Sequence, residues 1–321
     1  MSTLAFIDRL SPNFDARARA IDLVVLHYTG MQSAEIALAR LTDPAPVAGA
    51  YPGPWQSESA PADAPLGRVS AHYVVGEAGE IWRVVDEDAR AWHAGVSSWE
   101  GEGDVNSRAI GIEIANGGHD FGLPEFPEAQ ISAVIALVQD ILARRGLDAS
   151  RVVGHSDIAP ERKLDPGEKF PWRRLAEAGT AIWPKAAPVA ARAGEDVVGR
   201  VQAQLKRFGY SLDQTGAMDL PTRAALMAFQ RRFRPAKIDG LIDDETLQLL
   251  SALARWKLRV WPYRGPVALV ERDEFGMRED IHLIDRWRLT GTVQSEQALA
   301  ELLADGPNGR AFDPDVYRIV K

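Results

Sequence analysis

The chain has 321 residues, enough for two domains and an additional module. Hydrophobic residues make up 46% of it and charged residues 26%, which allows an ordinary hydrophobic core. The net charge of −8 argues against general binding to nucleic-acid phosphates, and no run approaches the roughly 18 apolar residues of a membrane-spanning helix. The absence of cysteine excludes disulfides, thiolate metal ligands and a cysteine nucleophile.

The N-terminus, MSTLAFIDRLSPNFDARARAID, lacks the basic segment, the apolar segment and the small-residue cleavage site of a secretory signal. There is also no cysteine that a lipid anchor would modify. The sequence therefore predicts a cytoplasmic location. A periplasmic location would require that the start of the protein has been assigned wrongly.

The first predicted element is a buried strand, because the β-branched run IDLVVL at 21–26 leads directly into His27. Residues 43–68 are dense in Pro, Ala, Ser and Gly and indicate a long surface loop or insertion, for which a functional lid and a plain irregular segment are both open. AHYVV (71–75) and IWRVV (81–85) flank GEAGE and predict a hairpin.

Three more elements complete the first half of the chain. AIGIEIA (109–115) predicts a strand whose isoleucines share one face, so that Glu113 points to the other. EAQISAVIALVQDILARR (128–145) has helical periodicity and ends before a glycine. A last strand at 151–154 ends at His155.

This order of elements predicts an α+β (mixed α/β) domain over residues 1–185, with a central mixed β-sheet and flanking helices. A Pro/Ala-rich linker at 183–194 leads to residues 195–254, whose periodic segments predict a small tri-helical module. Residues 256–321 change character again and predict a short α+β tail, with a β-hairpin-like segment before a short helix at 295–305.

The run VVGHSDIAPERKLDPG concentrates the candidate metal chemistry of the chain. Its Pro and Gly residues favour a loop over a helix, and a loop can bend His155 and Asp165 onto one metal ion. His27, at the end of a predicted strand, is the best third ligand. Two imidazoles and one carboxylate suit Zn²⁺ and leave a fourth position for a water whose pKa falls to roughly 7.

Two further residues supply the groups that metal-assisted amide hydrolysis needs. Glu113 lies in an apolar strand, where a carboxylate without a partner is costly, and is the candidate general base. Lys163 is a candidate donor to the developing oxyanion. Each residue alone also has an ordinary explanation, such as a structural histidine, a turn or a solvated edge residue. Their combination favours a catalytic site.

Five motifs, VVLHYTG, SAHYVV, AWHAGVSSW with Asn106, AIGIEIAN and VVGHSDIAPERKLDPG, closely resemble the zinc-dependent N-acetylmuramoyl-L-alanine amidases of the type 2 amidase family over residues 20–185. The resemblance implies cleavage of the amide between the lactyl group of muramic acid and L-alanine. It implies the following roles: His27, His155 and Asp165 as zinc ligands, Glu113 as acid/base and Lys163 as the lysine that stabilises the transition state. His93 and Asn106, in the third motif, are candidate substrate-binding residues.

Residues 197–253 resemble a type 1 peptidoglycan-binding domain, through VQAQLKRFGY, PTRAALMAFQRRF and IDGLIDDETLQLL. The pair of resemblances implies peptidoglycan or a muropeptide as the substrate. In the cytoplasm this implies cell-wall recycling, with anhydro-muropeptides as substrates. The tail faintly resembles a C-terminal segment of bacterial excision-type nucleases, but no nuclease core accompanies it, so we expect no nucleic-acid partner.

Two alternatives stay open. A non-catalytic peptidoglycan-binding receptor on the same scaffold typically lacks a zinc ligand, whereas all three candidate ligands are present here together with Glu113 and Lys163. A purely structural zinc site is usually closed by four protein ligands, and no fourth ligand is evident near these motifs. The oligomeric state, the preference for anhydro or ordinary muramic acid, and the role of the tail are not set by the sequence.

Overall fold

The structure, a computed structural model, describes residues 4–51, 61–186, 196–259, 267–272, 279–285 and 288–293. The chain divides into two compact units, Met1–Ala254 and Arg255–Lys321. No helix in the described part of the chain has the length and apolar character needed to cross a membrane.

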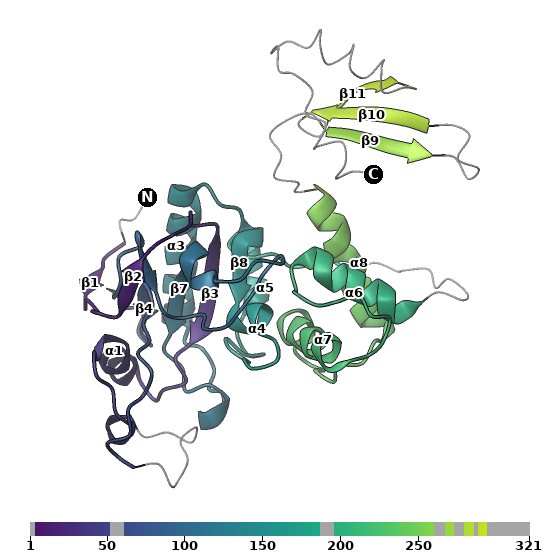
Figure 1. Cartoon of the computed structure of the whole chain (residues 1–321). Helices are drawn as coiled ribbons and strands as arrows, with labels where there is room; N and C mark the ends of the chain where they lie inside the picture. Colours follow the sequence, from purple (N-terminus) through teal and green to yellow (C-terminus); the bar gives the residue numbers. More distant parts are fainter. Residues whose placement is uncertain are drawn as a thin grey trace. The chain divides into compact units, whose positions relative to one another are not determined.

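A mixed six-stranded sheet with the order β1-β5-β4-β7-β3-β8 forms the centre of the first unit (Figure 1). Strands β4, β7, β3 and β8 run parallel, whereas β5 pairs with β4 in the antiparallel hairpin that the sequence predicts. The strands are β1 (Ile7–Asp8), β3 (Leu23–Tyr28), β4 (Tyr73–Val75), β5 (Ile81–Arg83), β7 (Ala109–Ile114) and β8 (Val152–Gly154); β2 (Phe14–Ala16) and β6 (Ala89–Ala91) form a separate antiparallel pair.

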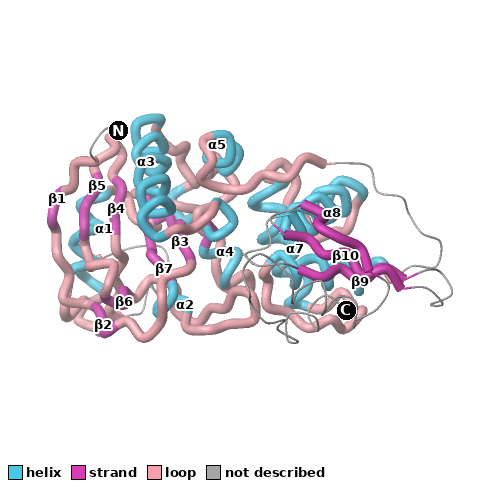
Figure 2. Tube along the Cα trace, turned by 90° about the horizontal axis from the view of Figure 1, so that it is seen from above, coloured by secondary structure: helices cyan, strands magenta, loops and turns pink. Residues whose placement is uncertain are grey.

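The long helix α3 (Glu128–Arg145) covers one face of this sheet (Figure 2). It has the predicted bounds, because Gly146 follows it in the left-handed conformation and its N–H caps the carbonyl of Leu142. The core between sheet and helix is made of alternate strand residues and one helix stripe: Val24, Leu26, Ile110, Ile112, Ile114, Ile131, Val134, Leu137, Val138 and Ile141. The intervening strand residues, which include His27 and Glu113, therefore face the other side.

Shorter helices complete the first half of the chain: α1 (Ala34–Thr42), α2 (Val105–Arg108), α4 (His155–Ile158), α5 (Trp172–Glu177), and the 3₁₀ turns η1 (Ala48–Ala50), η2 (His119–Phe121) and η3 (Ala149–Arg151). The predicted fold class is confirmed. One local prediction is wrong, because His155 does not lie in a loop but begins the one-turn helix α4. Part of the predicted insertion, residues 52–60, and most of the predicted linker lie outside the described residues.

The predicted tri-helical module consists of α6 (Val197–Phe208), α7 (Leu220–Phe233) and α8 (Asp244–Arg259). Asp196 and Asp219 cap the first two helices through their carboxylates. In the second unit, β9 (Val267–Arg272), β10 (Glu279–Asp285) and β11 (Arg288–Val293) form an antiparallel sheet with the order β11-β10-β9. The tail thus adds a third strand to the predicted hairpin, and its predicted helix lies outside the described residues.

Candidate active site

The candidate catalytic residues meet at one edge of the sheet, where the parallel strands end. In the register of β3 and β7, His27 lies directly beside Glu113, so both side chains leave the same face. β8 pairs with the other side of β3, and His155 follows its last residue. Carboxyl ends of parallel strands are the usual place for a site in such sheets, and here they bring together residues far apart in the sequence.

The segment 155–165 returns to its own start, which places Asp165 beside His155. The N–H of Ser156 donates to the carbonyl of Asp165 at 2.9 Å, and the N–H of Gly154 donates to Asp157 Oδ2 at 2.8 Å. The first bond closes the loop, and the second fixes the first turn of α4. Both side chains are buried, with 3% of His155 and 5% of Asp165 exposed.

Three buried ligand atoms converge at this point. His27 Nδ1 and His155 Nδ1 each lie 3.0 Å from Asp165 Oδ2, and the two nitrogens lie 2.9 Å apart. The remaining ring nitrogens are occupied, because His155 Nε2 donates to the carbonyl of Ala94 at 3.1 Å and His27 Nε2 lies 3.1 Å from His93 Nδ1. Such outer partners orient metal-binding imidazoles. The arrangement leaves both Nδ1 lone pairs and one carboxylate oxygen for a cation.

The electrostatics of the cluster favour the protonation states that a cation requires. Burial and the neighbouring His155 lower the pKa of His27 to about 4, against the opposing effect of Asp165. Burial raises the pKa of Asp165, but the two histidines outweigh it and hold that pKa far below its usual range. The neutral form of His27 and the ionised form of Asp165 are therefore the ones present at neutral pH. These are the protonation states in which a histidine and an aspartate bind a metal ion.

Glu113 has the environment of an acid/base group. Glu113 as a whole is partly exposed, yet its Oε2 atom is buried and has no hydrogen-bond partner in the described part of the chain. Burial, followed by the charge of Asp165, raises the pKa of Glu113 to about 8, and Lys163 opposes this shift. A carboxyl group with such a pKa exchanges a proton near neutral pH.

Lys163 is partly buried. Its positive charge acts on both His27 and Glu113 and lowers the pKa of each. Its backbone N–H donates to the carbonyl of Ala159 at 3.0 Å, which holds the loop in place. This charge is near enough to affect both residues, and the role of Lys163 as an oxyanion donor stays a prediction.

Of the two predicted substrate-binding residues, His93 contacts the candidate ligand His27, and Asn106 holds the backbone at His93. His93, with 8% exposed, contacts His27, and its ring packs on Gly111 so closely that a Cβ there would lie 2.4 Å from its Cγ. Asn106 Oδ1 accepts the N–H groups of His93 and Ala94, at 3.0 and 2.7 Å. These contacts orient the site from within, and the proposed binding of substrate by either residue stays a prediction.

The sequence analysis did not identify Arg162, whose hydrogen bonds hold the backbone beside the candidate ligand His155. Arg162 donates from Nε to the carbonyl of Val96 at 2.8 Å, and its Nη2 donates to the carbonyl of Ala94, the same atom that holds His155. The only sequence signal for this role was the cation's place between the two ligands His155 and Asp165, which does not distinguish it from a solvated arginine.

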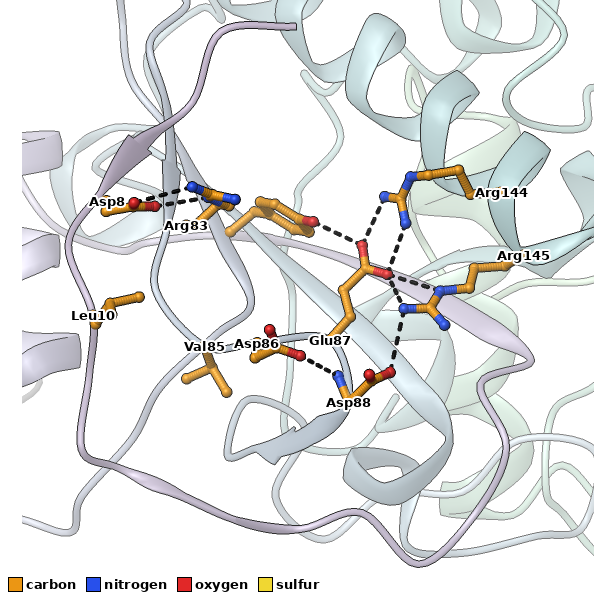
Figure 3. Close-up of a pocket in the computed structure, with 10 residues that line it drawn as sticks. Asp8, Leu10, Arg83, Val85, Asp86, Glu87, Asp88, Arg144 and Arg145 are labelled. Atoms are coloured by element: carbon orange, nitrogen blue, oxygen red, sulfur yellow. Dashed lines mark hydrogen bonds and ion pairs between the residues drawn. The ribbon is translucent and has the colours of Figure 1, made fainter.

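A pocket that none of the candidate ligands lines lies beside the end of α3 (Figure 3). It has a volume of about 460 Å³, and the buried Glu87 is at its centre. Hydrogen bonds from Arg144, Tyr73 and Arg145 overcome the effect of burial and lower the pKa of Glu87 to about 2. Side chains of the protein thus bind both carboxylate oxygens. We therefore interpret Glu87 as a structural link between α3 and the strands, and not as a binding site.

The family of N-acetylmuramoyl-L-alanine amidases matches residues 17–168, the peptidoglycan binding domain family matches residues 194–250, and the C-terminal domain of excinuclease Cho matches residues 266–321. The chain is 36% identical over 251 residues to the N-acetylmuramoyl-L-alanine amidase AmiD of Escherichia coli, a match that covers 73% of this chain and 82% of AmiD. It is 34% identical over 169 residues to the 1,6-anhydro-N-acetylmuramyl-L-alanine amidase AmpD of Haemophilus influenzae, which covers 51% of this chain and 86% of AmpD.

Two solved structures have the same fold over most of the chain. A complex of E. coli AmiD with anhydro-N-acetylmuramic acid-L-Ala-D-γ-Glu-L-Lys superposes with a TM-score of 0.60, at 33% identity, and covers 75% of this chain and 92% of AmiD. AmpDh3 of Pseudomonas aeruginosa in complex with an anhydromuramic pentapeptide also gives 0.60, at 32% identity, and covers 74% and 92%. The chain belongs to the N-acetylmuramoyl-L-alanine amidase family. The predicted family and the predicted class of enzyme, an amidohydrolase, are confirmed.

Proposed function

We propose that the protein is a zinc-dependent amidase that hydrolyses the bond between the lactyl group of muramic acid and L-alanine in anhydro-muropeptides. One observation supports the metal. Three buried ligand atoms of His27, His155 and Asp165 lie within 4.8 Å of one another, while the other ring nitrogens have hydrogen-bond partners. Two nitrogens and one oxygen suit Zn²⁺ better than the harder cations, which prefer oxygen ligands. Three ligands also leave a coordination position free.

Zinc bound there would supply an attacking water of lowered pKa and would polarise the substrate carbonyl. Glu113 takes the proton of the attacking water at its carboxylate and passes it to the nitrogen of the departing L-alanine. Its raised pKa makes both steps accessible near neutral pH. Lys163 places a positive charge beside the developing oxyanion.

The comparisons support the substrate. AmiD has been solved with an anhydro-muramyl tripeptide, AmpDh3 with an anhydromuramic pentapeptide, and AmpD is named for the 1,6-anhydro sugar. The family match over 194–250 adds a peptidoglycan-binding module to the amidase. A soluble peptidoglycan fragment with an anhydro end is therefore the proposed substrate, with a role in cell-wall recycling.

A product assay tests this function. We expect the zinc-loaded protein to release free peptide from an anhydro-muramyl peptide, measured by chromatography and mass spectrometry, and to lose this activity on chelation and regain it with zinc. Intact sacculi serve as the comparison substrate. Turnover that survives complete removal of metal, together with turnover by Asp165→Ala, would refute the zinc mechanism.

A non-catalytic peptidoglycan receptor is the second candidate. The same assay distinguishes it, because a receptor would bind the muropeptide stoichiometrically without releasing peptide. The buried Oε2 of Glu113 and its raised pKa favour the enzyme, since a receptor gains nothing from a costly carboxyl group beside its metal.

A further inference from the structure

The tri-helical module contributes a buried ion pair to the catalytic half of the protein. Arg232 of α7 donates from Nη1 to Asp157 Oδ2 at 2.6 Å and from Nη2 to the carbonyl of Val152 at 3.1 Å. The hydroxyl of Tyr210 donates to Asp157 Oδ1 at 2.7 Å. Only 2% of Arg232 and 1% of Asp157 and Tyr210 are exposed. Both oxygens of Asp157 thus depend on side chains of the module.

Asp157 also holds the helix that carries a candidate metal ligand. Its Oδ2 accepts the N–H of Gly154, at the start of α4, and His155 is the first residue of that helix. The carboxylate is therefore shared: one side fixes the turn that presents His155, and the other is bound by Arg232 and Tyr210. A buried carboxylate whose cation is removed is strongly destabilised where it stands, which favours a shift of its position.

Aromatic side chains surround the guanidinium of Arg232. Its guanidinium lies over the ring of Trp172 at 4.1 Å and over Phe233 at 4.9 Å. Nearby, the buried Trp99 packs edge-on against both Phe208 and Tyr210, with ring centroids 5.4 Å apart in each pair. Aromatic packing around a fully buried ion pair is typical of a domain core. It is untypical of a flexible tether, and residues 1–254 accordingly form one compact unit.

We infer that the module of residues 196–254 positions the metal ligand His155, and that Arg232 and Tyr210 are the positioning residues, acting through Asp157. The inference rests on the proposed zinc site. It adds a second role to a module whose family match describes only binding of peptidoglycan. Loss of the two contacts leaves the carboxylate of Asp157 without its cation, so the first turn of α4 relaxes and the Nδ1 of His155 leaves its place opposite Asp165.

The test measures zinc affinity in the full-length protein by competition with a chromophoric chelator. Arg232→Met keeps the length and apolar stem of the side chain and removes its charge, and we expect zinc to bind about tenfold more weakly, as when an outer partner of a ligand is lost. Arg232→Lys restores a charge and should recover most of that loss. Tyr210→Phe removes one hydrogen bond and should weaken zinc binding by about threefold.

Leu250→Ala is the matched control. Leu250 is buried in α8 of the same module, and its truncation lowers stability without touching Asp157. We expect this variant to unfold at a lower temperature and to keep the zinc affinity of the parent. On a small soluble muropeptide, Arg232→Met should lower kcat at saturating zinc while KM changes by less than threefold, because the shift acts on the metal rather than on the substrate.

An unchanged zinc affinity in both Arg232→Met and Tyr210→Phe would overturn the inference. So would an equal loss in Arg232→Met and Leu250→Ala, which would indicate a general effect of stability. Should Arg232→Met fail to fold, Tyr210→Phe decides alone. Failure of the proposed function is separate, since it would appear in the unaltered protein as an absence of zinc binding.

Discussion

The proton-transfer role of Glu113 gives the most direct test of the site. Glu113→Gln keeps the shape of the side chain and removes its ability to accept a proton. None of the three converging ligand atoms belongs to Glu113, so the metal site retains its ligands. Burial and the charge of Asp165 raise the pKa of the native carboxyl to about 8, and the glutamine abolishes this titration.

The expected loss follows from what a general base contributes. Positioned acid/base groups accelerate reactions by about 10² to 10⁴-fold, equivalent to about 3–5 kcal/mol of barrier. We expect the upper half of this range, because Oε2 is buried without a hydrogen-bond partner among the described residues. In the parent, kcat/KM should rise with pH through an apparent pKa above 4.5, the usual value for glutamate, because the base must be deprotonated.

The assay follows peptide release from an anhydro-muramyl peptide and zinc content in the same samples. Glu128→Gln is the control, since Glu128 is exposed at the start of α3, and it should behave as the parent does. Two results would refute the reasoning: turnover by Glu113→Gln within threefold of the parent, or loss of its zinc.

Further outcomes follow from the same structure. Asp165→Ala removes one of three ligands and should abolish stoichiometric zinc binding, measured by metal analysis after dialysis; zinc retained at one per chain would contradict the ligand set. Lys163→Met should retain zinc and lower kcat by about 10² to 10³-fold, whereas an effect on KM alone would assign it to binding. Burial, then Arg17, lowers the pKa of His72 to about 4. Because the unfolded chain protonates this histidine between pH 6.5 and 4 and the folded protein does not, His72 alone should make unfolding of the zinc-free protein in urea easier by about 2 kcal/mol at pH 5 than at pH 7. His72→Gln should lose this share of the pH dependence, and an unchanged pH dependence in that variant would refute the assignment. Deletion of residues 260–321, which keeps all of α8, should leave muropeptide hydrolysis unchanged, and a tenfold loss would show that hydrolysis needs the tail.

The sequence determined the elements of the catalytic half because their patterns are local. The apolar run before His27, the alternation around Glu113 and the periodicity of 128–145 each report the burial of one face, and the structure has a strand or helix at each position. The candidate ligands were predictable for the same reason, since each follows or ends a recognisable strand or lies in one dense motif. The helical start at His155 was missed because a single turn is too short to produce a period.

Only the tertiary structure decided which groups support the ligands. His93 lies 66 positions from His27, and Arg232 lies 75 positions from Asp157, yet both pairs are in contact. No local pattern identifies such pairs, because the residues next to an arginine in the sequence do not show whether its side chain will be buried or exposed. What the sequence defined as a separate module is, in the folded protein, joined to the catalytic half by a buried ion pair and by aromatic packing. The physical reason is that a buried charge needs a partner, and the fold supplies that partner from another segment of the chain.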